Sequence, residues 1–159
     1  PTQIDVAAWV TLALLVFGPG VAAAAITAPF LAADRLRSLF RTLPPTDSVV
    51  VSYLLVTVGG SLPYVVGTGA ILTAFAGSSP ASGATVAERL LGLATVVSLV
   101  VVVGWPTVCG LVLPEVGYDW DPTGYGWDTW LLLIGGAVWY VAGFTVVLGF
   151  AAFFLALPT

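Results

Sequence analysis

The sequence predicts an all-α integral membrane protein, a four-transmembrane-helix bundle with Gly/Pro-kinked helices and one short interfacial amphipathic segment. Of its 159 residues, 59% are hydrophobic and only 8% are charged. A soluble domain carries about 45–50% apolar and about 25% charged residues. This chain therefore lacks the polar residues that a water-facing surface needs, and its composition fits a lipid-facing surface instead.

Four apolar runs are long enough to cross a bilayer, which takes about 20 residues in a helix. None of them carries a charge in its central part. A helix is the spanning form open to a separate segment, because it bonds every backbone N–H and C=O internally. We expect a single membrane domain over residues 1–159. Its segments are predicted as spans at about 6–33, 48–76, 86–113 and 128–157, an interfacial segment at about 34–43 and an aromatic, acidic loop at 114–127.

The composition also argues against most catalytic and cofactor chemistry. The chain has no histidine and no lysine, and Cys109 is its one cysteine. Histidine ligation, internal disulfides and thiolate metal clusters are therefore excluded, and no base is available to activate a serine nucleophile. We expect no cofactor and no enzymatic activity. The net charge of −4 excludes a nucleic-acid-binding surface, and the lack of lysine predicts a salt-adapted, halophilic source.

The arginines predict how the chain sits in the membrane. Arg35, Arg37 and Arg41 lie in the first connection, whereas Arg89 is the one arginine expected on the opposite side. Short cytoplasmic loops carry an excess of basic residues. We therefore expect a multi-pass protein of the cell (plasma) membrane, with the arginine-rich loop in the cytoplasm and both termini outside.

The first connection also contains the one amphipathic segment of the chain. Apolar residues recur there at helical spacing, and the three arginines fall between them. The apolar members are Leu36, Leu39, Phe40 and Leu43. This pattern predicts a short helix at the membrane surface, with apolar side chains in the lipid and guanidinium groups at anionic headgroups. A segment that sets the topology without selecting any lipid is the favoured interpretation, and a binding site for an anionic headgroup is the alternative.

Helix-breaking residues lie inside three of the four predicted spans. They are Gly18, Pro19 and Gly20 in the first span, Gly59, Gly60 and Pro63 in the second, and Pro106 in the third. Proline removes one helical hydrogen bond and clashes with the preceding turn, so we expect kinks at these places. In some transporters such breaks expose backbone groups that bind a substrate. Kinks that shape packing are favoured here, because no acid, amide or histidine lies beside them.

Small residues form two rows at helical spacing. The first row is Gly20, Ala24 and Ala28, and the second row is Gly135, Ala142 and Gly149. Small side chains allow a neighbouring helix to approach closely, and a spacing of seven favours left-handed coiled geometry. The rows therefore predict packing seams, either inside the bundle or against another subunit.

The third connection is rich in aromatic and acidic residues. Asp119 and Asp121 match the start of a calcium-binding loop, but Trp130 stands where that loop needs a bidentate glutamate. A type I turn explains the same stretch, because aspartate, proline and glycine suit its first, second and fourth positions, so no metal is expected. The aromatic residues are expected at the headgroup level, as a docking surface for a partner. They are Tyr118, Trp120, Tyr125, Trp127 and Trp130.

Three functions fit these observations. The favoured one is a non-catalytic structural or accessory subunit, which packs against itself in a homo-oligomer or against another membrane protein in a larger complex. The second is a small homo-oligomeric channel or transporter for a neutral solute or an ion. The third is a membrane enzyme acting on lipid through Glu115, Asp119 or Asp121. The first is favoured because the charged residues lie at helix ends or in loops, whereas ion-translocating proteins keep ionisable groups within their spans.

Overall fold

The computed structural model describes residues 6–75 and 83–157 of the chain. Within these stretches every regular element is helical. Four helical segments are long and apolar enough to cross a membrane, and they are Ala7–Ala32, Val49–Phe75, Gly83–Glu115 and Trp127–Ala156. The predicted all-α membrane bundle with four spans is therefore confirmed.

The elements follow the predicted order along the chain. They are α1 (Val6–Thr27), the 3-10 turn η1 (Ala28–Ala32), α2 (Asp34–Thr42), α3 (Val49–Phe75), α4 (Gly83–Thr107), the π-helical turn η2 (Val108–Val112), the short α5 (Leu113–Glu115) and α6 (Trp127–Ala156). Ser48 caps the start of α3, since its hydroxyl accepts a hydrogen bond from the Val51 N–H at 3.4 Å. The fourth span differs, because Gly126 caps α6 without any side-chain hydrogen bond.

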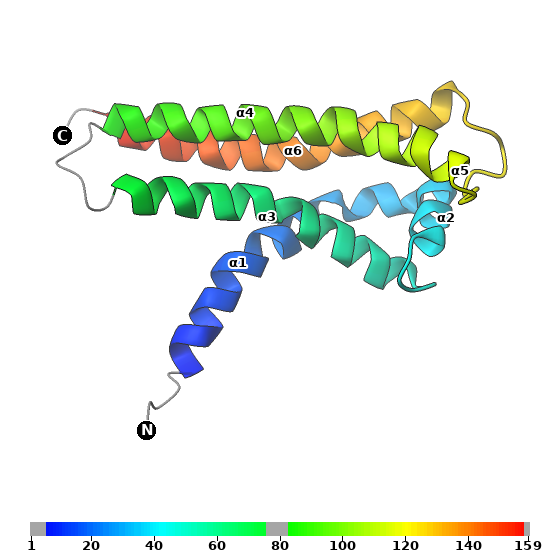
Figure 1. Ribbon diagram of the computed structural model, residues 1–159, viewed down its shortest axis with the longest axis horizontal. Helices are drawn as coiled ribbons and strands as arrows, with labels where there is room; N and C mark the ends of the chain where they lie inside the picture. Colours follow the sequence, from blue (N-terminus) through cyan, green and yellow to red (C-terminus); the bar gives the residue numbers. More distant parts are fainter. Residues whose placement is uncertain (1–5, 76–82, 158–159) are drawn as a thin grey trace.

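α4, α6 and much of α3 run roughly along one axis (Figure 1). α4 and α6 lie side by side over most of their length, and α3 lies beside them. The N-terminal part of α1 points away from the other helices, whereas η1 runs beside them. α2, α5 and the 116–126 connection gather at one end of the bundle, opposite the start of α4 and the end of α6.

Proline occurs inside three of the spans, and the helices continue past it each time. Pro19 lies within α1, Pro63 within α3 and Pro106 within α4. The ribbons of α1 and α3 are bent (Figure 1). Beyond Pro106 the backbone passes into η2, where the N–H of Leu113 bonds to the carbonyl of Val108, five residues earlier. π-Helical structure occurs mostly in this form, as a single turn inserted into an α-helix.

The bundle is packed most tightly where small or aromatic residues meet. A Cβ added at Gly20 of α1 would lie 2.7 Å from the Val58 Cα of α3, so the two helices approach each other closely there. Elsewhere in the bundle, the rings of Tyr64 and Phe144 stack with their centroids 4.4 Å apart. The Tyr64 hydroxyl shares a 2.9 Å hydrogen bond with Ser98. These contacts join α3, α4 and α6.

Candidate functional site

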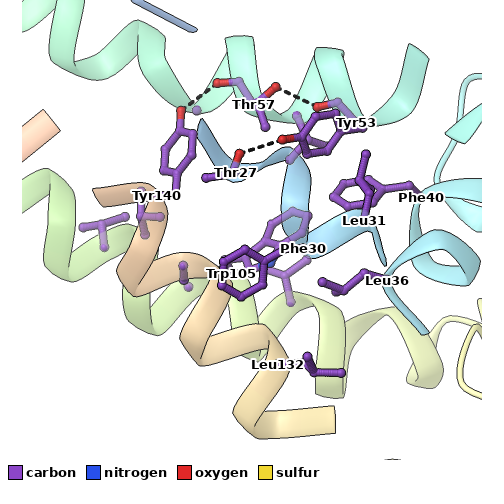
Figure 2. Close-up of a pocket in the computed structure, with 18 residues that line it drawn as sticks. Thr27, Phe30, Leu31, Leu36, Phe40, Tyr53, Thr57, Trp105, Leu132 and Tyr140 are labelled. Carbon is purple, nitrogen blue, oxygen red and sulfur yellow. Dashed lines mark hydrogen bonds between the residues drawn. The ribbon is translucent and has the colours of Figure 1, made fainter. Parts of the chain in front are cut away.

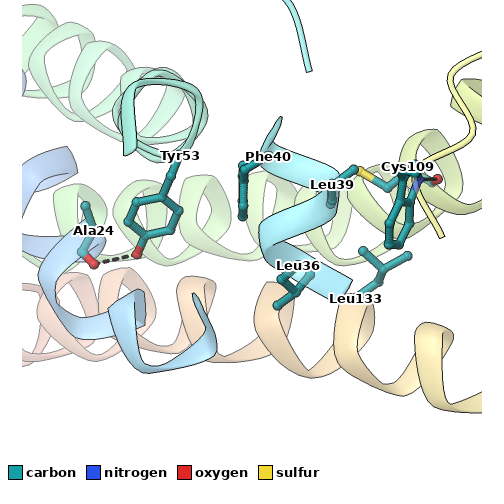
Figure 3. Packing of buried hydrophobic residues seen from close by; sticks show 8 residues of the cluster. Ala24, Leu36, Leu39, Phe40, Tyr53, Cys109 and Leu133 are labelled. Carbon is teal, nitrogen blue, oxygen red and sulfur yellow. Dashed lines mark hydrogen bonds between the residues drawn. The ribbon is translucent and has the colours of Figure 1, made fainter. Parts of the chain in front are cut away.

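The amphipathic helix α2 packs onto the end of the bundle with its apolar face. Leu36, Leu39 and Phe40 are buried, and Leu39 is 0% exposed. They belong to one cluster with Cys109 and Leu133 from the spans (Figure 3). The expectation that this face dips into lipid is therefore corrected. A local pattern shows that a helix has an apolar face, but not whether protein or lipid covers it.

Polar contacts add to this packing. The Arg35 Nη1 donates a hydrogen bond to the Thr129 Oγ1 of α6 at 3.1 Å. The Ser38 hydroxyl donates to the backbone carbonyl of Trp120 at 2.6 Å. These two bonds, together with the buried Asp121, join α2 to the third connection and to α6. We call these five residues the latch.

Asp121 is the buried acid of the latch, with 3% of its surface exposed. One carboxylate oxygen accepts hydrogen bonds from the Thr123 N–H at 3.0 Å and the Thr123 hydroxyl at 2.7 Å. The other accepts a short hydrogen bond from the Thr129 hydroxyl. Burial raises the pKa of Asp121, but the hydrogen bonds from Thr129 and Thr123 and the charge of Arg35 outweigh burial and hold the pKa below its ordinary value of 3.8. Asp121 is therefore ionised at neutral pH.

Hydrogen bonds also fix the fold of the candidate calcium-binding loop and occupy its two aspartates. The Gly124 N–H donates to the Asp121 carbonyl at 3.2 Å, and Gly124 has a φ of +83°, so a turn begins at Asp121. The other candidate ligand, Asp119, accepts a hydrogen bond from the Tyr125 hydroxyl at 2.9 Å. Both oxygens of Asp121 already accept hydrogen bonds, and no group of three His, Cys, Asp or Glu residues suited to a metal occurs in the described residues.

The five aromatic residues of this region do not share one surface. Trp120 is buried, and its indole Nε1 donates to the Cys109 carbonyl at 2.8 Å. Trp130 lies against Gly110, where an added Cβ would be 2.8 Å from the indole ring. Tyr125 packs edge-on to Trp120 at 5.5 Å. Tyr118 and Trp127 are exposed, whereas Tyr125 and Trp130 are half-buried.

The three arginines of the first connection also separate. Arg35 is half-buried and donates a hydrogen bond to Thr129. Arg37 forms an exposed ion pair with Asp34 at 3.0 Å. Arg41 is exposed. The contact of these arginines with lipid headgroups stays a prediction.

A cavity of about 350 Å³ lies within the bundle, bordered by η1, α2, α3, α4 and α6 (Figure 2). Aromatic rings form much of its wall, and the other lining residues are largely aliphatic or glycine. The rings belong to Phe30, Phe40, Tyr53, Trp105 and Tyr140. The cavity is partly open to its surroundings rather than fully enclosed.

The hydroxyl groups around the cavity are turned to the protein backbone. Tyr53 donates to the Ala24 carbonyl at 2.5 Å and shares a 2.6 Å hydrogen bond with the Thr27 hydroxyl. Tyr140 donates to the Thr57 carbonyl at 2.6 Å, and the Thr57 hydroxyl donates to the Tyr53 carbonyl at 2.8 Å (Figure 2). The cavity therefore offers its contents a wall that is apolar in effect.

The sequence did not mark this cavity as a site. Tyr53 and Tyr140 lie inside long apolar runs. Their hydroxyl groups were the one feature of these runs that could have indicated a cavity wall. Gly60 was predicted only as a kink, yet an added Cβ there would lie 3.0 Å from the Tyr140 hydroxyl. By contrast, Cβ atoms added at Gly18 or Gly59 would meet nothing within 4 Å.

The two predicted seams have different surroundings. Gly20 and Ala24 of the first row are buried, whereas Ala28 is exposed. In the second row Ala142 is exposed, and a Cβ added at Gly149 would meet nothing within 4 Å. A Cβ added at Gly135, the remaining member, would just reach the Phe30 ring at 4.0 Å. The second row therefore has little close contact within the described chain.

These features define a class of protein: a four-span helical membrane bundle with a docked amphipathic helix at one end and an apolar cavity inside. Residues 7–159 match the model of the family described as "Domain of unknown function (DUF8162)". The chain belongs to that family. No curated protein and no solved structure matches it.

Proposed function

We propose that the protein is a non-catalytic structural or accessory subunit, which packs in a homo-oligomer or in a larger membrane complex. The observation that carries this proposal is the course of α1, whose N-terminal part leaves the bundle (Figure 1). Its side chains are exposed there, with Trp9 at 63%, Leu14 at 67% and Leu15 at 65%. In a bilayer, helices associate through close van der Waals contact. A span that leaves its own bundle presents a surface on which a helix of another chain can make that contact.

The outward row on α6 supports the same proposal. Ala142 is exposed and Gly149 has open space where a Cβ would be. Small residues facing outward allow another helix to approach at short distance. Two separate surfaces, one on α1 and one on α6, therefore suit contacts between chains.

The reactive groups of the described chain favour a role without catalysis. Cys109 is completely buried, and the acceptor oxygens of Asp121 are used by Thr123 and Thr129. The alternative of a channel or transporter for an ion gains nothing from the cavity, because an apolar wall does not replace an ion's hydration.

We infer that α2 lies on the cytoplasmic side of the plasma membrane and that both termini lie outside. The support is the arginine count, with Arg35, Arg37 and Arg41 near one end of the bundle and Arg89 near the other. Arg37 and Arg41 are the arginines that would meet anionic lipid there. The lysine-free composition supports a salt-adapted source.

The mass of the protein particle tests the packing role. We expect mild-detergent extracts from the native membrane to contain the 16.3 kDa chain in complexes of fixed composition, measured by native mass spectrometry. Double substitution of Ala142→Leu and Gly149→Leu is expected to break these complexes, whereas Gly92→Leu, on an exposed position of α4 with open space around it, leaves them intact. A wild-type protein that is monomeric under these conditions contradicts the proposal.

A second measurement distinguishes self-association through α1 from a foreign partner. Cys109 is buried, so a cysteine introduced by Leu14→Cys would be the accessible thiol of the described chain. Oxidation is expected to link two copies if α1 meets α1 of a second protomer, and Val147→Cys on α6 provides a matched exposed control. A complex whose added mass is a different chain assigns the role to a larger assembly.

A further inference from the structure

We propose that the cavity within the bundle binds one hydrocarbon chain, belonging to a membrane lipid or to an isoprenoid, and that this chain enters from the bilayer. The inference concerns a ligand and does not depend on the packing role proposed above. The volume of about 350 Å³ lies within the range of ligand sites, roughly 300–1,000 Å³.

The chemistry of the wall selects a hydrocarbon. None of the residues that line the cavity is charged. Its hydroxyls donate to backbone carbonyls, as Tyr53 does to Ala24 and Tyr140 does to Thr57. A polar ligand would lose its hydration and would find the hydroxyl protons of this wall already donated to backbone carbonyls, which is costly. A hydrocarbon has no hydration to lose, and aromatic walls give it extensive dispersion contact.

The shape of the cavity favours an extended chain. Along α4 and into the start of η2 the lining runs from Val100 to Val108, and on α6 it runs from Leu132 to Tyr140. Each stretch covers eight residue steps, or about 12 Å along a helix at about 1.5 Å per residue. The cavity is therefore elongated along the spans, which is also the direction of lipid chains in a bilayer.

The docked helix α2 explains the direction of entry. Leu36 and Phe40 line the cavity at the end of the bundle, and both are buried. The bonds from Arg35 to Thr129 and from Ser38 to Trp120 hold α2 in this position. α2 thus lies between the cavity and this end of the bundle, and the cavity is partly open rather than enclosed.

Photo-crosslinking of the full chain in lipid vesicles tests this proposal. One arm uses phosphatidylcholine with a diazirine on an acyl chain, and the other uses a prenyl alcohol with a diazirine on its chain. We expect mass spectrometry to find label on Trp105 and Tyr140, which line the cavity, as well as on the lipid-exposed Phe150. Labelling by one probe alone identifies the acyl or the isoprenoid chain as the ligand, and labelling by both supports a site for either.

Filling the cavity provides the decisive comparison. Gly104 lines the cavity and has open space where a Cβ would be. Gly104→Leu is expected to lower labelling of Tyr140 about tenfold relative to Phe150, because leucine takes the place of roughly two ligand methylenes. Gly92→Leu is the matched control on α4, since Gly92 also has open space but does not line the cavity.

A second pair of variants keeps the test decisive if Gly104→Leu does not fold. Gly136 lines the cavity, and an added Cβ would be in ordinary contact with Phe30 at 3.8 Å. Gly136→Val is expected to lower labelling of Trp105, while Gly143→Val, on the same helix and outside the lining, leaves it unchanged. Absence of label from Trp105 and Tyr140 with both probes overturns the proposal, and so does undiminished label in a folded cavity-filling variant.

Discussion

Trp120 and Asp121 are neighbours in a connecting segment, and both are buried, although connecting segments normally run over the surface. Trp120 donates a hydrogen bond to the Cys109 carbonyl, and Asp121 accepts hydrogen bonds from Thr123 and Thr129. The adjacent Asp119 is exposed. Two aspartates in one short stretch thus have opposite environments, because docking of α2 covers one of them and leaves the other in water.

Asp121→Asn is expected to lower the free energy of unfolding at pH 7 by about 2–4 kcal/mol, because it removes a buried, hydrogen-bonded charge near Arg35. The folded pKa of Asp121 lies below its ordinary value of 3.8. The stabilisation is therefore complete above about pH 4 and is lost as the pH falls through the lowered folded pKa. Thermal unfolding in detergent between neutral and strongly acidic pH would measure the effect.

The difference between wild type and Asp121→Asn should accordingly shrink below pH 3.8. Asp119→Asn is the matched control, since its hydrogen bond to Tyr125 is exposed, and we expect a cost below about 1 kcal/mol. Equal stability of the Asp121→Asn variant and the wild type at pH 7 would show that the latch does not hold α2.

The helices themselves show which properties are local. The spacing of apolar residues predicts a helix over residues 34–43, and α2 covers Asp34–Thr42. The predicted second span, 48–76, is observed as Val49–Phe75. The spacing of apolar residues does not predict which other helix each helix packs against. α2 turns its apolar face to Cys109 and Leu133, which lie more than sixty residues further along the chain.

The close approach of α1 and α3 can be tested with a pair of glycines. Gly20→Val is expected to cost about 1–3 kcal/mol through overpacking, because its Cβ would lie 2.7 Å from the Val58 Cα and the backbone must move. Gly18→Val is the control, since a Cβ there meets nothing within 4 Å. Chemical or thermal unfolding in detergent would compare them. Equal effects of the two substitutions would mean that α1 and α3 do not meet at Gly20.

The whole molecule has two chemically different ends. The end with α2 carries Arg35, Arg37 and Arg41 together with the acidic and aromatic connection, while Arg89 lies near the other end (Figure 1). The charges of the described chain thus lie in the connections or near the ends of the apolar spans. Such an arrangement suits a protein that crosses the bilayer without moving charge through it.

The orientation predicted from the arginines can be measured with introduced thiols. Asp47→Cys lies beside the α2 end and Ala84→Cys lies at the start of α4, and both positions are exposed. In intact cells we expect a membrane-impermeant maleimide to label Ala84→Cys, and to label Asp47→Cys only after the membrane is opened. The buried Cys109 keeps the background low. The reverse pattern would place the arginine-rich end outside.

Length and hydropathy were sufficient to predict the four spans, because a segment in lipid must satisfy its own backbone hydrogen bonds and does so as a helix. The turn at Asp121 was predicted separately, from the aspartate, proline and glycine that suit its positions. The burial of Leu39, Trp120 and Asp121, and the cavity between the helices, required the folded arrangement. Lipid chains are as apolar as a protein core, so a one-dimensional pattern does not distinguish a leucine that faces the bilayer from one that faces another helix.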